Sequence, residues 1–246
     1  MLPQGMFSVA VATVLFPQLA RLAARKDYAG LQATIGVGMR QIALLLIPAG
    51  AAMLVLSEPM VRLVFQRGEF DAESTKLTAE ALFWFSFSLP FSGWVLMLTR
   101  GFFSLQRPWI PTTLAVGSLA INAGGSYVLA KAMGIGGIVL GTTISNAALV
   151  AAEWVMLRRA LGGFQTRRTL LATAQMLAGA AVLSLVAYGV WWAIDDVLGR
   201  SLIAQIVSVG AALVAGSAAY AAVVLGLKIP EARQIVDLFA RRLRRS

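Results

Sequence analysis

The chain of 246 residues contains no cysteine and no histidine, and only 13% of its residues are charged. Without cysteine it forms no disulfide, and without histidine it lacks the usual general base and the commonest metal ligand. Most enzyme mechanisms lose their central residue here, so we expect a protein that is not an enzyme. Soluble domains average about 25% charged residues, which argues against a water-soluble monomer.

The chain is rich in long apolar runs, and 59% of its residues are hydrophobic. About 20 apolar residues in a helix cross the roughly 30 Å hydrocarbon core of a bilayer. Seven uncharged runs have 17 or more residues, and they cover 1–20, 41–57, 81–99, 108–130, 132–152, 169–194 and 201–227. The sequence therefore predicts an all-α polytopic membrane protein with seven transmembrane helices.

The distribution of Lys and Arg predicts how these helices are oriented. If the first run crosses from outside to inside, only five of the 21 basic residues fall outside, namely Arg62, Arg67, Lys76, Lys131 and Arg200. The positive-inside rule then places the N-terminus outside and the C-terminus in the cytoplasm. The net charge of +10 is explained by topology and by attraction to anionic lipid. We expect no nucleic-acid partner, and a basic amphipathic surface helix over 229–243.

The first run is unusually polar for a helix that faces lipid. It carries Gln4, Ser8, Thr13 and Gln18, together with Pro17. We expect it to line a water-filled cavity as part of a substrate pathway. The alternative is that its hydroxyl groups bond within the helix or to a neighbouring helix. No charge precedes Arg21, so the run does not have the form of a signal peptide, and further spans are expected upstream.

Two connections carry structural signals. Between the second and third runs, residues 59–65 predict a short interfacial helix that Gly68 ends, and Asp71 is expected to cap the next helix. Between the third and fourth runs, Pro108 and Pro111 predict a tight elbow.

One polar cluster has two interpretations. Asn122 and Ser126 lie four residues apart on one helix face, and Thr142 lies in the next run with a Gly137–Gly141 packing pair nearby. Their oxygen atoms are the ligands that a hard cation such as Na⁺ takes, so this is the one candidate cofactor site. Because no carboxylate balances the charge, interhelical hydrogen bonding is the alternative.

Several motifs together resemble the MurJ/MviN family of lipid II flippases. Residues 4–21 are similar to the family's eighth transmembrane helix, "lP-G-f-vAlaTvl-P-ls". Residues 65–71, with Gly68, Phe70 and Asp71, are similar to the "f-rGaFd" loop. Arg100 with Pro111 follows "R-a-fya…tP", and residues 133–146 follow "lG-aGlalatslaa-vN". Leu105-Gln106 departs from the Gly-Asp pair that the family often has there.

The resemblance implies helices eight to fourteen of a two-lobe transporter of the MOP exporter superfamily. Residues 1–160 would form five spans of the second lobe, 161–228 two C-terminal helices that make an apolar groove for a polyprenyl tail, and 229–246 a basic cytoplasmic tail. The implied function is to flip lipid II across the bacterial inner membrane by alternating access. The implied partners are lipid II, membrane lipid and a missing N-terminal lobe.

Two alternatives stay open from the sequence. One is a polysaccharide or multidrug exporter of the same superfamily, for which acidic residues in the cavity would speak. The only acidic residues expected in the first five spans are Glu80 and Glu153, both at helix ends. The other is a membrane scaffold without transport, which needs no kinked polar helix.

Overall fold

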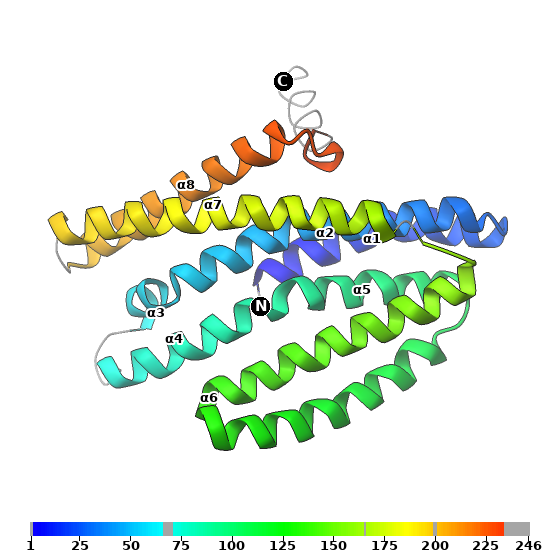
Figure 1. Ribbon diagram of the computed structural model, residues 1–246, viewed down its shortest axis with the longest axis horizontal. Helices are drawn as coiled ribbons and strands as arrows, with labels where there is room; N and C mark the ends of the chain where they lie inside the picture. Colours follow the sequence, from blue (N-terminus) through cyan, green and yellow to red (C-terminus); the bar gives the residue numbers. More distant parts are fainter. Residues whose placement is uncertain (1, 66–70, 165, 199–200, 234–246) are drawn as a thin grey trace.

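The computed structural model describes residues 2–65, 71–164, 166–198 and 201–233, and all secondary structure in these ranges is helical. Figure 1 shows the helices lying roughly along one direction in a layered bundle. In chain order they are α1 (Leu2–Ala24), α2 (Tyr28–Val55), α3 (Ser57–Phe65), α4 (Ala72–Ser86), α5 (Ser88–Ser104), α6 (Trp109–Leu161), α7 (Thr166–Leu198) and α8 (Leu202–Gly226).

Helix α2 begins well before the apolar run that predicted it. Asp27 caps its N-terminus by accepting a hydrogen bond from the backbone N–H of Gly30 at 2.9 Å. The helix therefore includes Arg40, which the sequence placed in a connection on the inner side. That expectation is wrong because Arg40 is paired inside the protein, so its charge does not interrupt the helix.

The third predicted span is a bent pair of helices. α4 and α5 meet at Phe87 with an angle of 42° between them. Pro90 lies in the first turn of α5, where proline is tolerated because the N–H groups of a first turn have no partner within the helix. The pair covers the apolar run at 81–99.

Helix α6 is a hairpin of two antiparallel arms. Gly134 has φ 60° and ψ −132°, a conformation that is not helical and that favours glycine. The hydroxyl of Ser145 donates to the carbonyl of Ser118 at 2.6 Å, and that of Ser126 donates to the carbonyl of Ile138 at 3.0 Å. Figure 1 shows the arms, 109–133 and 135–161, side by side.

The helices account for the seven expected spans. Five helices are long and apolar enough to cross a membrane by themselves, and the α4–α5 pair makes a sixth span. Each arm of α6 has at least 25 residues, hence a length of about 37 Å, so each can cross separately. The two predicted runs 108–130 and 132–152 correspond to these two arms.

Helix α2 belongs to both hydrophobic cores and thereby joins the two parts of the bundle. One core packs Ala43, Leu44 and Ile47 of α2 against Met176 of α7 and Tyr220 of α8. The other packs the opposite side of α2 against α1, α5 and the second arm of α6, through Leu19, Ile35, Leu46, Met97, Phe102 and Leu157.

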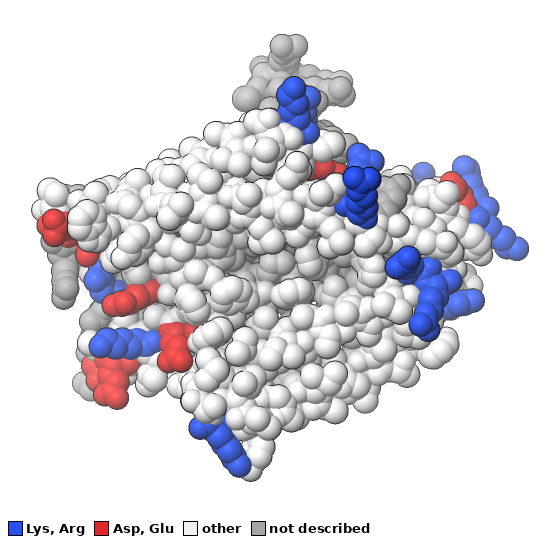
Figure 2. Space-filling model, viewed as in Figure 1, with Lys and Arg blue, Asp and Glu red and all other residues white. Residues whose placement is uncertain are grey.

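Most of the charged side chains in Figure 2 lie at the two ends of the molecule, with an uncharged surface between them. Arg62 of α3 and Asp195 of α7, both expected outside, form an ion pair at 2.8 Å. Glu153 is an exception to the predicted distribution. It was expected in an inner connection at a helix end, yet it lies inside α6 and is 1% exposed.

The two connections follow the predictions where the structure describes them. α3 is the short helix expected before Gly68, and the Asp71 side chain accepts from the backbone N–H of Ser74 at 2.8 Å. Pro108 caps the start of α6, so the elbow is where it was expected. Arg67, Gly68, Phe70 and residues 234–243 of the predicted surface helix lie outside the described residues.

Candidate functional site

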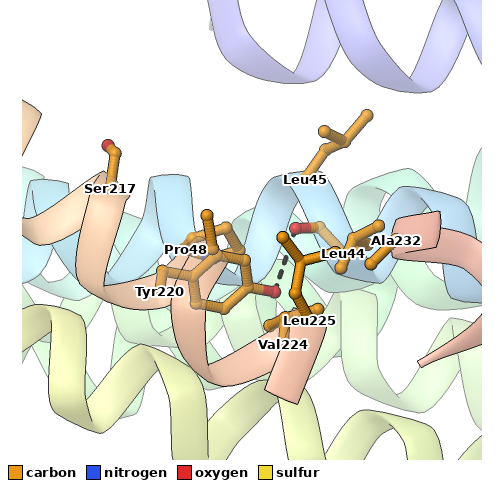
Figure 3. Close-up of a pocket in the computed structure, with 9 residues that line it drawn as sticks. Leu44, Leu45, Pro48, Ser217, Tyr220, Val224, Leu225 and Ala232 are labelled. Atoms are coloured by element: carbon orange, nitrogen blue, oxygen red, sulfur yellow. Dashed lines mark hydrogen bonds between the residues drawn. The ribbon is translucent and has the colours of Figure 1, made fainter. Parts of the chain in front are cut away.

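An apolar groove lies between α2 and α8. Its volume is about 260 Å³. Figure 3 shows the side chains that line it converging from α2, α8 and the segment that follows α8. They are Leu44, Leu45, Pro48, Ser217, Tyr220, Ala221, Val224, Leu225 and Ala232.

The one phenol in this groove has its polar atom occupied. The hydroxyl of Tyr220 donates to the carbonyl of Leu44 at 3.0 Å, across 176 residues of sequence (Figure 3). This bond connects α8 to α2, and the apolar ring of Tyr220 lines the groove. The remaining lining is almost entirely hydrocarbon, so the groove is suited to an apolar chain and offers little to a charged ligand.

The four polar residues predicted for a pathway along α1 do not share one face. Ser8 is fully buried against Gly93 of α5, and its hydroxyl has no hydrogen-bond partner. Thr13 is exposed, because five residues place it about 140° around the helix from Ser8. Gln4 is half-buried, and exposed Gln18 donates to the hydroxyl of Thr34 at 3.4 Å. The broad exposed surface of α1 thus includes both Thr13 and Gln18, which themselves lie about 140° apart around the helix.

The hairpin α6 brings together the polar cluster expected from the sequence. The Asn122 amide donates to the Thr142 hydroxyl at 3.2 Å, and the Ser126 hydroxyl lies 3.3 Å from Asn122 Oδ1. The first of these bonds links the two arms, as the packing interpretation expects, and the second lies within the first arm. The same three oxygens are the ones that would hold Na⁺.

The residues taken from the family motifs have structural roles where they are described. The Arg100 guanidinium lies 5.4 Å from the ring centroid of Phe16 and so joins α5 to α1. Pro17 lies inside α1, and Pro111 is buried in the first turn of α6. Hydrogen bonds from the backbone N–H and then the hydroxyl of Ser74 lower the pKa of the Asp71 carboxyl below its usual value.

The sequence analysis did not predict that three charged residues are buried inside the bundle. Arg40 and Glu231 pair with each other, and Glu153 accepts a hydrogen bond from Thr99. Arg40 Nη1 also lies 3.5 Å from the Thr169 hydroxyl. The only sequence feature that could have indicated their burial is that they lie beside long apolar runs. Ordinary charged loop residues share this feature, so it does not identify a buried charge.

Together, the apolar helices and the charges at their ends define an α-helical multi-pass membrane protein. The sequence matches the family model described as lipid II flippase MurJ over residues 1–207. The chain therefore belongs to the MurJ family.

Individual relatives agree with this assignment. A protein named probable lipid II flippase MurJ from Rhizobium meliloti is 35% identical over 158 residues, which are 63% of this chain and 29% of the relative. A protein of the same name from Vibrio cholerae is 29% identical over 58% of this chain and 27% of the relative. The lipid II flippase MurJ of Burkholderia cenocepacia is 28% identical over 56% of this chain and 27% of the relative. The matched part is less than a third of each relative.

A solved structure has the same fold. It is titled lipid II flippase MurJ, inward closed conformation, and superposes with a TM-score of 0.64 at 20% sequence identity. The match covers 88% of this chain and 43% of that chain. The all-α polytopic membrane fold expected from the sequence is therefore confirmed.

Proposed function

We propose that this chain forms the second lobe of a flippase that carries lipid II across the bacterial cytoplasmic membrane by alternating access. Membership of the MurJ family over residues 1–207 is the observation that supports this proposal. Lipid II joins a polyprenyl tail to a pyrophosphate and a sugar-peptide head. Such a head cannot enter hydrocarbon unaided, because burying unpaired charge costs many kcal/mol. No covalent bond changes, so the activity is transport and not enzymatic catalysis.

The groove between α2 and α8 is the proposed seat of the polyprenyl tail. Its lining is apolar, and its phenol is already hydrogen-bonded to Leu44. We assign 161–228 to the tail-binding part and 1–160 to the lobe that moves, and α2 of that lobe forms the other wall of the groove. The exposed surface of α1, which includes Thr13 and Gln18, would face the head group and a first lobe on the opposite side. In this arrangement the N-terminus of the chain lies outside and the C-terminus in the cytoplasm.

The other candidates have less support. Polysaccharide and multidrug exporters of the superfamily share the architecture, but the relatives reported above are named as lipid II flippases. A scaffold requires neither the apolar groove nor polar residues on the exposed surface of α1.

Two neighbouring alanines on α8 provide the test. Ala221 lines the groove, whereas Ala222 is also exposed but is not part of the lining. The chain would be co-expressed with the first lobe of a related flippase in cells depleted of their own, and lipid II would be measured at the outer surface. We expect Ala221→Trp to block transport by filling the groove and Ala222→Trp to leave it unchanged.

Two outcomes would contradict the proposal. Equal transport by the two variants would show that the groove does not hold the tail. We expect the chain without a first lobe to give no transport, because alternating access needs two walls. Rescue of the depleted cells by these 246 residues alone, with no partner recovered on purification, would contradict the half-transporter proposal.

A further inference from the structure

A carboxyl group without a cation is buried between α5 and the second arm of α6. It belongs to Glu153, which is 1% exposed. Thr99 of α5 donates its hydroxyl hydrogen to Glu153 Oε1 at 3.0 Å. The other oxygen, Oε2, is buried and has no hydrogen-bond partner among the described residues. One turn later, Leu157 belongs to the apolar core that joins α1, α2, α5 and α6, and one turn earlier the partly buried Val150 packs against that core.

In the part of the chain that the structure describes, no cation forms an ion pair with this carboxyl. Within the described ranges the ion pairs are Arg40–Glu231 and Arg62–Asp195, so Arg40 of α2 is already engaged. Arg100 is the only charged residue of α5, and its guanidinium lies over a ring of α1. The other titratable groups on the helices that pack on this arm form no ion pair with Glu153. They are Tyr28 of α2, Glu73, Lys76 and Glu80 of α4, and Tyr127, Lys131, Arg158 and Arg159 of α6 itself.

The surroundings therefore favour an uncharged side chain. A carboxylate in a low-dielectric interior is strongly destabilised unless it is paired with a cation and fully hydrogen-bonded, and Glu153 has one bond from a neutral hydroxyl. A neutral acid in the same place leaves only one O–H without an acceptor, which is a much smaller penalty. Glu153 lies eight residues before the end of α6, about 12 Å inside the helix. Ionisable groups at such positions in membrane helices commonly take part in ion or proton pathways.

We propose that Glu153 is a proton-binding site that is neutral while α5 packs on the second arm of α6 and is deprotonated when these helices separate. On separation the O–H bond of the carboxyl breaks, the proton passes to water, and the electron pair stays on the carboxylate. Proton concentration thereby biases the α5–α6 contact, by at most tenfold per pH unit for a single proton. The site is distinct from the Asn122 cluster and does not depend on which lipid the protein carries.

Infrared spectroscopy of the full chain in lipid bilayers tests the protonation state. The carbonyl stretch of a protonated carboxylic acid is separate from the bands of carboxylates and amides. We expect such a band at neutral pH, its loss in Glu153→Gln, and its retention in Glu80→Gln, which removes an exposed acid. Spectra in which Glu153→Gln and the unmodified chain show the same carboxylic-acid region would mean that Glu153 is charged, and the proposal would fail.

A second variant serves if Glu153→Gln does not fold. Thr99→Val removes the only hydrogen bond that the carboxyl accepts while keeping the side chain's shape. The carboxylic-acid band should then move in frequency without disappearing. An unmoved band would show that it comes from another residue.

The link to helix separation has its own measurement. Because the chain has no cysteine, spin labels can be attached at Phe103→Cys on α5 and Val155→Cys on α6, two exposed positions. We expect the distance between the labels to increase as pH rises in the otherwise unmodified chain, and to stay constant in Glu153→Gln. A distance independent of pH in both proteins would overturn the coupling of the proton to this contact.

Discussion

Arg40 and Glu231 lie 191 positions apart in the sequence and form an ion pair whose side chains are 2% and 3% exposed. The pair fastens the segment after α8 to the middle of α2, next to the residues that form the groove with Tyr220. The hydropathy pattern could not show that Arg40 is buried and paired, because its partner lies near the other end of the chain.

Removing one member of this pair should be costly. A buried charge left without its partner destabilises a protein by about 3–5 kcal/mol, so Arg40→Gln should lower the unfolding midpoint in detergent well below that of the unmodified chain. Arg233→Gln changes an exposed cation two residues after Glu231 and is the matched control. The double variant Arg40→Met with Glu231→Leu should recover most of the loss. Equal midpoints for Arg40→Gln and Arg233→Gln would contradict the pairing.

The α6 hairpin makes a prediction about two glycines. A Cβ at Gly141 would collide with Ser126 on the other arm, whereas a Cβ at Gly124 would meet nothing within 4 Å. Gly141→Ala should therefore cost about 1–3 kcal/mol through overpacking, while Gly124→Ala should be neutral or slightly stabilising, since alanine favours a helix. Thermal unfolding of both variants measures the difference. If the two variants unfold at the same temperature, the two arms of α6 are not in close contact at Gly141.

The Asn122 cluster remains a predicted Na⁺ site. If Asn122, Ser126 and Thr142 hold the ion, Asn122→Ala should weaken the sodium dependence of lipid II transport. If these residues only join the arms, as their hydrogen bonds allow, the variant should lower the amount of folded protein and leave the response to sodium unchanged. Transport is measured at several sodium concentrations at equal protein level.

The cap of α4 should depend on pH at the acidic end. Hydrogen bonds from Ser74 lower the pKa of Asp71 from its usual value of 3.8, so the capping contribution is present above about pH 4 and is lost as pH falls through the lowered value. Amide exchange of Ser74 and Thr75 should accelerate in that acidic range, relative to exchange in an unfolded peptide. Asp71→Asn also caps but does not titrate, so its exchange should show no such step. A step of equal size in both would exclude Asp71 as its source.

The proposed orientation can be tested with single cysteines, because the chain contains none. Ser74→Cys, in the first turn of α4, should react with an impermeant maleimide in intact cells. Thr166→Cys, at the start of α7, should react only after the membrane is opened. The reverse pattern would invert the assignment of N-terminus outside and C-terminus inside.

The sequence alone determined the features that depend on local composition. Apolar runs of span length predicted the seven segments, because a helix must satisfy its own backbone bonds in lipid. Asp71 and Pro108 mark helix starts through bonds and angles within one turn. Asn122 and Thr142 could be placed together since they face each other across a short hairpin.

The tertiary structure decided what depends on distant partners. Whether Arg40 ends a helix or lies inside one depends on Glu231, which reaches it only after α7 and α8 have packed on α2. Ser8 faces α5 while Thr13 stays exposed, because the neighbour of α1 and not its own polarity selects the buried face. Glu153 resembles a loop charge in sequence, and only the packing of α5 on α6 makes it a buried acid without a cation.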